Sequence, residues 1–172
     1  YWGNSYPCDE FLYAYLITCP IPREFRNQKP THVSLVEKKC NIATNILTIN
    51  YNMLKESEQK DDFAVCVKML DFLHEDWSVR VVEWIEMLRL LGANKIIFYT
   101  LHVNENMMKV FEYYKQEGIV EVVPITLGGY QPNAMGFQHL YLYSNWRNYF
   151  QRTLHELISI NDCFYKNMYK YK

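Results

Sequence analysis

The sequence predicts an α/β fold with a mostly parallel sheet, preceded by a β-rich N-terminal extension. Two observations lead to this fold class. From residue 61 onward, apolar runs alternate with amphipathic stretches in the order strand, helix, strand, helix, strand, long loop, helix. Each strand–helix–strand unit crosses over right-handed, which places its two strands parallel. Because ligands of such sheets bind at the carboxyl ends of the strands, we expect functional residues there.

Residues 1–60 differ from the rest and are predicted to form the extension. Partial apolar alternation with β-branched residues predicts short strands within residues 32–40 and 45–53. A charged segment without apolar residues follows, KESEQKDD, and marks the boundary to a second domain at 61–172. In this segment Glu56 and Glu58 are spaced as a carboxylate pair, but no rigid strand presents them, so no metal site is predicted there.

The first strand and helix of the second domain follow directly. The continuous apolar run at 63–70 is typical of a strand buried on both faces. A helix is predicted over residues 78–92, with Ser78 or Asp76 as its cap and Gly92 as its left-handed end. Its apolar face consists of Val81, Val82, Ile85, Leu88 and Leu91.

The next strand–helix–strand unit covers residues 94–127. A buried strand is predicted at 94–102, a helix at 105–118 that ends at Gly118, and a third strand at 119–127. The residues of this helix that face inward are expected to be Met107, Val110, Phe111 and Tyr114.

A connection at 128–146 is too long for an ordinary loop and is therefore expected to be functional. A final helix is predicted from about Arg147 to Met168. Its predicted buried stripe consists of Phe150, Leu154, Leu157, Ile158, Asn161, Phe164 or Tyr165, and Met168. A helix at this point of an α/β fold is normally followed by another strand, so we expect the sequence to be the first part of a larger domain.

The composition excludes several classes of function. Apolar residues make up 49% and charged residues 22%, which is typical of a globular protein. The net charge of −1 gives no electrostatic preference for nucleic acid, so no nucleic-acid partner is predicted. The sequence lacks a glycine-rich dinucleotide or P-loop motif, a GxSxG elbow and an HExxH motif. It also contains no CxxC pair, and no histidine has zinc-ligand spacing.

The five cysteines do not define a compartment by themselves. Cys8, Cys19 and Cys40 lie in the loop-rich extension, where disulfides would fit a secretory protein. Cys66 and Cys163 lie in predicted core elements, and we expect each to be a small buried thiol.

Four polar residues stand out in the predicted elements, and each has a structural and a functional interpretation. Asn161 lies on an apolar stripe, so either its amide is buried with partners or the helix breaks there. Arg152 either pairs with Glu156 one turn away or binds a ligand. His102 lies at the end of a predicted strand and is either a rim residue of a site or an ordinary loop histidine. Lys68 lies near the carboxyl end of another strand, and its charged end reaches either a binding cleft or solvent.

The sequence resembles glycosyltransferase family 92 over roughly residues 63 to 172. The segments that carry the resemblance, in order, are FAVCVKMLDF, RVVEWIEMLRLLGANKIIFYTLH, VFEYYKQEGIVEVVPITL, GGYQPN and HELISINDCFYKNMYKYK. The resemblance implies the N-terminal half of a Rossmann-like GT-A domain, the fold of nucleotide-diphospho-sugar transferases. It also implies sugar-nucleotide-binding roles for Lys68, Leu70, His102, Arg152, Asn161 and Asp162.

The same resemblance implies a hexosyltransferase that moves a hexose, with galactose expected, from a UDP-sugar donor to a glycan acceptor. The complete enzyme is expected to use Mn²⁺, with the metal ligands on a strand beyond Lys172, so this chain alone is expected to be inactive. The parent protein is expected in the Golgi membrane, with an upstream transmembrane helix and a lumenal catalytic domain. The alternative is a non-catalytic Rossmann-like binding or scaffold protein that has lost the metal motif; a methyltransferase is disfavoured because no glycine-rich first loop is present.

Overall fold

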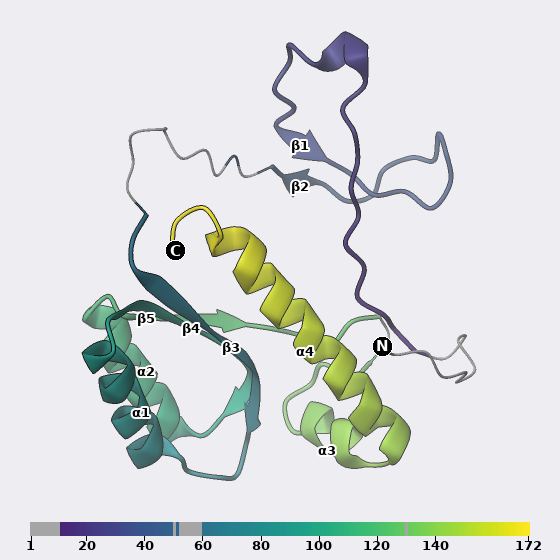
Figure 1. Cartoon of the computed structure of the whole chain (residues 1–172). Helices are drawn as coiled ribbons and strands as arrows, with labels where there is room; N and C mark the ends of the chain where they lie inside the picture. The colour runs from purple at the N-terminus through teal and green to yellow at the C-terminus, as the bar shows by residue number, and fades with distance from the viewer. Residues whose placement is uncertain (1–10, 50, 52–59, 130) are drawn as a thin grey trace.

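The structure is a computed structural model that describes residues 11–49, 51, 60–129 and 131–172. Its centre is a three-stranded parallel sheet in the order β3–β4–β5, with β3 at Phe63–Phe72, β4 at Ala93–Val103 and β5 at Val120–Pro124 (Figure 1). The predicted parallel α/β architecture, consistent with a Rossmann-like GT-A half, is confirmed. The Glu56 and Glu58 pair lies outside the described residues.

Two helices, α1 (Ser78–Leu90) and α2 (Glu105–Gln116), cover one face of this sheet. Their C-terminal ends form as the pattern predicts, since Gly92 and Gly118 have positive φ angles of 91° and 80°. The N-cap of α1 is Trp77 rather than Ser78 or Asp76, although Asp76 Oδ1 accepts a hydrogen bond from the Ser78 amide. The buried core between helices and sheet consists of Ile85, Ile96, Phe98, Met107, Phe111, Tyr114 and Val120. The predicted inward face of α2 is thus confirmed for its central residues.

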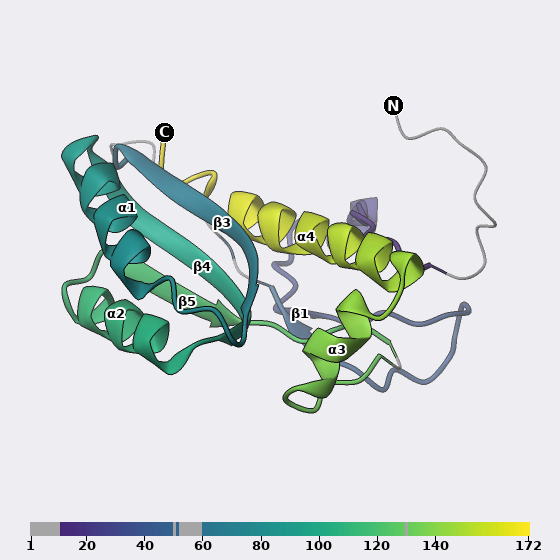
Figure 2. The same ribbon diagram turned by 90° about the horizontal axis from the view of Figure 1, so that it is seen from below.

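The other face of the sheet is crossed by one long helix, α4, at Trp146–Asn167 (Figure 2). The bounds of α4 agree with the prediction to within a residue or so, and the helix continues unbroken through Asn161. A short helix, α3 (Phe137–Tyr143), precedes it and lies at the carboxyl end of β3. The region of α3 was predicted as loop, since a seven-residue helix between polar segments shows too little periodicity to be recognised.

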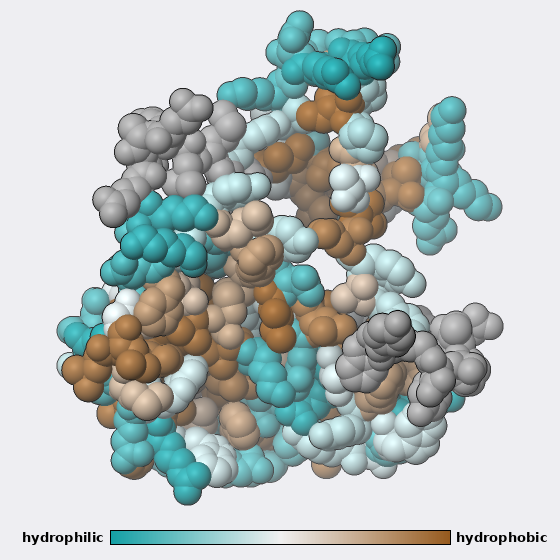
Figure 3. All heavy atoms as spheres, in the orientation of Figure 1, coloured by the Kyte–Doolittle hydropathy of each residue, from teal (hydrophilic) through white to brown (hydrophobic). Residues whose placement is uncertain are grey.

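The predicted buried stripe of α4 is confirmed for Leu154 but wrong for most of its other residues. The buried side chains of this helix are mainly polar, namely Asn148, Gln151, Leu154, His155, Ser159 and Cys163. The apolar residues Leu157, Ile158, Ile160 and Phe164 are exposed, and brown patches over α4 are visible in Figure 3. Periodicity alone assigns the apolar face to the sheet, whereas hydrogen bonds and a disulfide select the polar face here.

That disulfide joins Cys66 on β3 to Cys163 on α4, with their Cα atoms 5.9 Å apart. The expectation of two free buried thiols is therefore wrong. The two cysteines are 97 residues apart in sequence, and only the crossing of α4 over β3 brings them together. Cys19 and Cys40 are free and exposed.

The first strand is also less buried than predicted, because β3 is an edge strand of the described sheet. Cys66 and Lys68 are exposed rather than enclosed on both faces. At the amino end of β3, Asp61 forms a parallel bridge with Tyr171. The Asp61 amide donates to the Lys170 carbonyl over 3.0 Å, and the Lys172 amide donates to the Asp61 carbonyl over 3.1 Å.

The N-terminal extension contains an antiparallel pair of two-residue strands, β1 (His32–Val33) and β2 (Leu47–Thr48). They lie within the two predicted strand regions but are much shorter than those regions. The extension contacts the second domain through Leu12, whose backbone amide and carbonyl each form a 2.8 Å hydrogen bond with the Gln151 side chain on α4. In the part of the chain that the structure describes, no helix is long and apolar enough to cross a membrane.

The disulfide gives the first prediction. Replacement of both Cys66 and Cys163 by serine should lower the free energy of unfolding by about 2–5 kcal/mol, because the unfolded chain loses a large closed loop. Urea unfolding of the parent protein and of the double variant, followed by circular dichroism, measures this difference. Cys19→Ser and Cys40→Ser are the matched controls and should leave the midpoint unchanged, since both side chains are exposed and unpaired. An unchanged midpoint in the double variant would show that the crosslink does not hold the fold.

Candidate functional site

Polar side chains gather at the carboxyl end of β3, where the strand is irregular. The pairing of β3 with β4 shifts register between Val67 and Leu70 and again between Leu70 and Asp71. These irregularities place Asp71 opposite His102. Strand bulges commonly redirect side chains beside functional sites, and here one delivers a carboxylate into the interior.

Asp71 lies between two histidines from different elements. Its side chain is 0% exposed, with Oδ1 3.4 Å from His102 Nδ1 on β4 and Oδ2 3.1 Å from His139 Nδ1 on α3. The sequence interpretation identified His102 but missed Asp71 and His139. An aspartate at the end of an apolar strand was the available signal, because a buried carboxylate is costly unless it is paired.

A second group brings together the two predicted cationic residues. Lys68 Nζ lies 3.0 Å from Glu156 Oε2, and Arg152 Nη2 lies 3.8 Å from Glu156 Oε1. The i,i+4 pairing expected for Arg152 is thus present. The Arg152 guanidinium also lies 5.2 Å from the ring centroid of Tyr143 and 5.8 Å from that of Tyr149. Its buried Nε has no hydrogen-bond partner among the described residues.

Tyr143 connects these two groups. Its ring centroid lies 4.8 Å from that of His139, and the Arg152 guanidinium lies over the same ring. Burial raises the pKa of the Tyr143 hydroxyl, the Arg152 charge lowers it, and the Asp71 charge raises it. We call the connected residues the edge cluster; it comprises Lys68, Asp71, His102, His139, Tyr143, Arg152 and Glu156.

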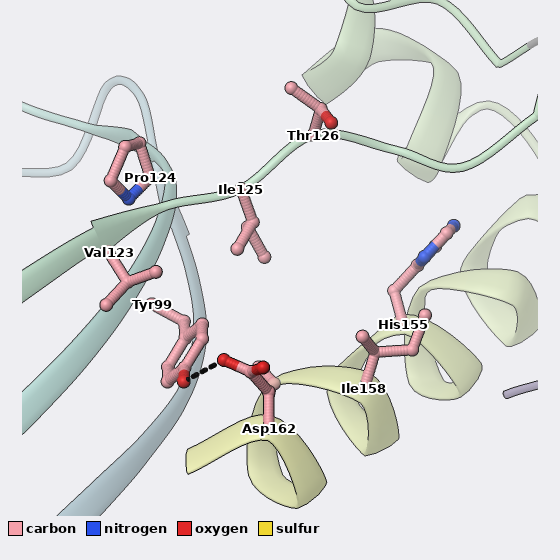
Figure 4. Close-up of a pocket in the computed structure, with 9 residues that line it drawn as sticks. Tyr99, Val123, Pro124, Ile125, Thr126, His155, Ile158 and Asp162 are labelled. Atoms are coloured by element: carbon pink, nitrogen blue, oxygen red, sulfur yellow. Dashed lines mark hydrogen bonds between the residues drawn. The ribbon is translucent and has the colours of Figure 1, made fainter. Parts of the chain in front are cut away.

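A cavity of about 330 Å³ lies on the other side of α4, beside the carboxyl end of β5 (Figure 4). The Tyr99 hydroxyl on β4 donates to Asp162 Oδ2 over 2.6 Å, and Lys166 Nζ lies 2.7 Å from the same oxygen. Burial and the hydrogen bond to Asp162 both raise the pKa of Tyr99. The remaining walls of the cavity are formed by Val123, Pro124, Ile125, Thr126, His155, Ile158 and Ser159.

His155 on α4 closes one wall of this cavity and is itself held by the long connection. Gln131 Nε2 donates to the Gly128 carbonyl and lies 2.9 Å from His155 Nε2, so this ring nitrogen accepts and the proton resides on Nδ1. Burial lowers the pKa of His155, which keeps the imidazole neutral at neutral pH. The connection predicted to be functional thus holds one wall residue of the cavity through Gln131, although the wall itself is formed by other segments.

The structure places the six predicted site residues in four settings. Lys68, His102 and Arg152 belong to the edge cluster, and Asp162 lines the cavity. Leu70 packs against the core beneath α1 and α2. Asn161 is exposed, and its amide donates to the Leu157 carbonyl within α4, so the buried-amide interpretation is wrong.

Comparison with known proteins identifies the family of the chain. The sequence model of glycosyltransferase family 92 matches residues 61–172, which is more than half of the chain. The chain belongs to glycosyltransferase family 92. No curated protein and no solved structure gives a significant match. The match confirms the resemblance in the sequence and supports a glycosyltransferase.

The residues of this family 92 chain that the structure describes do not form a metal site. Among them, no group of three or more His, Cys, Asp or Glu side chains could hold an ion. In the Asp71–His102–His139 group, each contact to the carboxylate comes from an imidazole nitrogen, and the contact from His139 is a hydrogen bond.

The buried tyrosines of the family 92 domain predict a loss of stability at high pH. The pKa of Tyr99 is raised, and burial with a hydrogen bond to Glu86 raises that of Tyr114 to about 12. Above pH of about 10 the unfolded chain loses its tyrosine protons first, so the free energy of unfolding should fall as pH rises. Urea midpoints at about pH 8 and about pH 11 measure this fall, which should be smaller in Tyr99→Phe.

At about pH 8, Tyr99→Phe should itself cost about 1–2 kcal/mol, since Asp162 loses one donor but keeps Lys166. Tyr15→Phe is the control, because the Tyr15 side chain is 82% exposed and should change neither quantity. Equal pH dependence in Tyr99→Phe and the parent would contradict the assignment.

Proposed function

We propose that this chain is part of a hexosyltransferase that transfers galactose from UDP-galactose to a hydroxyl group of a glycan. Membership of glycosyltransferase family 92 supports the reaction class. The observation that carries the proposal is the convergence of Lys68, Arg152 and His102 in one cluster at the carboxyl ends of the strands. This is the edge at which open α/β sheets bind nucleotides.

The cationic half of the edge cluster fits the diphosphate of the donor. Glu156 holds Lys68 and Arg152 on the same side of α4, which keeps both cations near one position. The Lys68 side chain is 57% exposed and can exchange part of its contact with Glu156 for a phosphate oxygen. The planar Arg152 fork, with its unpartnered Nε, offers a further donor to the same group.

The remaining predicted residues fit less direct roles in donor binding. Asp162, held by Tyr99 and Lys166, lies in the cavity and would accept hydrogen bonds from donor hydroxyl groups. Leu70 has its side chain in the core, so it would contribute through its backbone. Asn161 would contribute only through a rotation of its side chain away from the Leu157 carbonyl.

In the reaction, the bond between the anomeric carbon and the diphosphate oxygen breaks, and a bond to the acceptor oxygen forms. The acceptor proton passes to a carboxylate base, and UDP leaves with the bonding electron pair. We propose that the complete enzyme binds Mn²⁺ through carboxylates that follow Lys172, since carboxylate oxygens hold such hard cations and the cation offsets the charge of the departing diphosphate. The parallel bridge between Asp61 and Tyr171 supports a fourth strand beside β3 in that position.

We propose the Golgi lumen as the location, with an upstream transmembrane helix in the parent protein. The Cys66–Cys163 disulfide supports this location, since such bonds persist in oxidising compartments of the secretory pathway.

Titration of the full-length protein with UDP-galactose and Mn²⁺ in a calorimeter tests the proposal. The parent should bind, and Lys68→Ala and Arg152→Ala should each weaken binding by roughly tenfold, because each removes a charge-assisted contact to phosphate. Lys115→Ala is the matched control: Lys115 is similarly exposed and also paired with a glutamate, but on α2, and its replacement should not change affinity.

Absence of nucleotide binding by the parent, with or without metal, would contradict the donor proposal and favour a scaffold that has lost the chemistry. Binding of UDP-glucose in preference to UDP-galactose would retain the reaction class and correct the sugar. Transfer of labelled galactose to a glycan mixture then tests the acceptor class.

A further inference from the structure

Two buried polar atoms of the edge cluster face each other without completing a hydrogen bond. Asp71 Oδ1 and His102 Nδ1 are 3.4 Å apart, and each is buried and unpartnered among the described residues. The side chains of the two residues are only 0% and 5% exposed. Buried polar atoms in this state are uncommon in folded proteins, and long contacts of this kind at functional sites often tighten when a ligand binds.

The location of this contact is also unusual. Two consecutive irregularities in β3 end at Asp71, so the backbone deviates from regular pairing to bring this carboxylate beside His102. The second histidine, His139, comes from α3 and contacts the other carboxylate oxygen over 3.1 Å. Three separate elements therefore converge on one fully buried carboxylate, an arrangement that packing alone would not favour.

The geometry fixes the orientation of both rings. Each imidazole presents Nδ1 to one oxygen of Asp71. Oδ2 accepts from His139 Nδ1, whereas Oδ1 and His102 Nδ1 lie 3.4 Å apart without a hydrogen bond, at a distance that a small movement would close. In a neutral imidazole whose Nδ1 carries the proton, Nε2 is a hydrogen-bond acceptor. Among the described residues, neither Nε2 atom has a hydrogen bond.

The neighbours of the His139 ring are other planar side chains. Its ring lies 5.6 Å from the centroid of His74 in an edge-to-face arrangement and 4.8 Å from that of Tyr143. Beyond Tyr143 lies the Arg152 guanidinium, at 5.2 Å from that ring. Such planar groups favour stacking with a nucleobase.

We infer that Asp71 is a positioning residue that orients His102 and His139 as acceptors for the nucleoside end of the donor. A uracil N–H or a ribose hydroxyl donates to such an acceptor, whereas a diphosphate offers only acceptors and pairs with Lys68 and Arg152 instead. The inference rests on the proposed function. It divides the edge cluster into a nucleoside-binding half and a diphosphate-binding half.

The test compares three probes on the full-length protein in the presence of Mn²⁺. UDP binding is measured directly by calorimetry, and uridine and inorganic pyrophosphate are measured by displacement of UDP. In Asp71→Asn, the amide can accept from only one imidazole, so the other ring must turn or change tautomer. Uridine and UDP should both bind about five- to tenfold more weakly, whereas pyrophosphate should bind unchanged.

Asp62→Asn is the matched control, since it makes the same substitution in an exposed residue next to the opposite end of β3, and it should leave all three affinities unchanged. His139→Phe provides a second variant that keeps a ring against His74 and Tyr143 but removes both nitrogens. This variant should bind uridine and UDP more weakly and should bind pyrophosphate with unchanged affinity.

Equal weakening of all three probes would show a general structural role for Asp71, and unchanged uridine affinity in both variants would remove the positioning role. Either result would overturn the inference but leave the proposed function in place. Absence of UDP binding by the parent protein would overturn both.

Discussion

The crossing of α4 over β3 is the constraint on which the candidate site depends. The Cys66–Cys163 disulfide fixes this crossing and with it the rotation of α4 about its own axis. With Cys163 facing β3, Arg152 and Glu156 reach the edge cluster, while His155, Ser159 and Asp162 face the cavity on the other side. One covalent contact thus places residues from a single helix at two parts of the site.

The polar face of α4 is stable against the sheet because its side chains have partners. Asn148 donates to the Ser144 hydroxyl, and Ser159 donates to the Glu156 carbonyl. The Gln151 side chain accepts from the Leu12 amide and donates to the Leu12 carbonyl. Burial of a polar group that has a hydrogen-bond partner destabilises the fold little, whereas a buried amide without a partner would destabilise it by about 1–3 kcal/mol. The N-terminal segment at Leu12 therefore contributes to the helix that carries the site, although it lies outside the family 92 match.

Local sequence patterns predicted the part of the fold that local interactions determine. Gly92 and Gly118 end their helices with positive φ angles, and Met107, Phe111 and Tyr114 form the inner face of α2, because turn geometry and helical periodicity depend on nearby residues.

Contacts between distant segments were not predictable in this way. The disulfide, the burial of Asp71 and the polar contact face of α4 each depend on tertiary packing, and a single sequence does not show which elements meet. Lys68, His102 and Arg152 were found because their type and position were unusual, whereas His139 lay in a segment whose helix was not recognised.

The fourth strand proposed above would account for the exposure of β3 at the edge of the described sheet. An edge strand presents unpaired amide and carbonyl groups, and at β3 the residues Lys170–Lys172 already satisfy the first of them in parallel orientation.

Continuation of that pairing along β3 would bring a strand toward Cys66 and Lys68 and would cover backbone groups that are now exposed. The strand would end at the same edge as Asp71, because parallel strands have their carboxyl ends on one side of the sheet. Carboxylates at its end would then lie beside the cations held by Glu156, which is where a donor diphosphate needs its charge balanced.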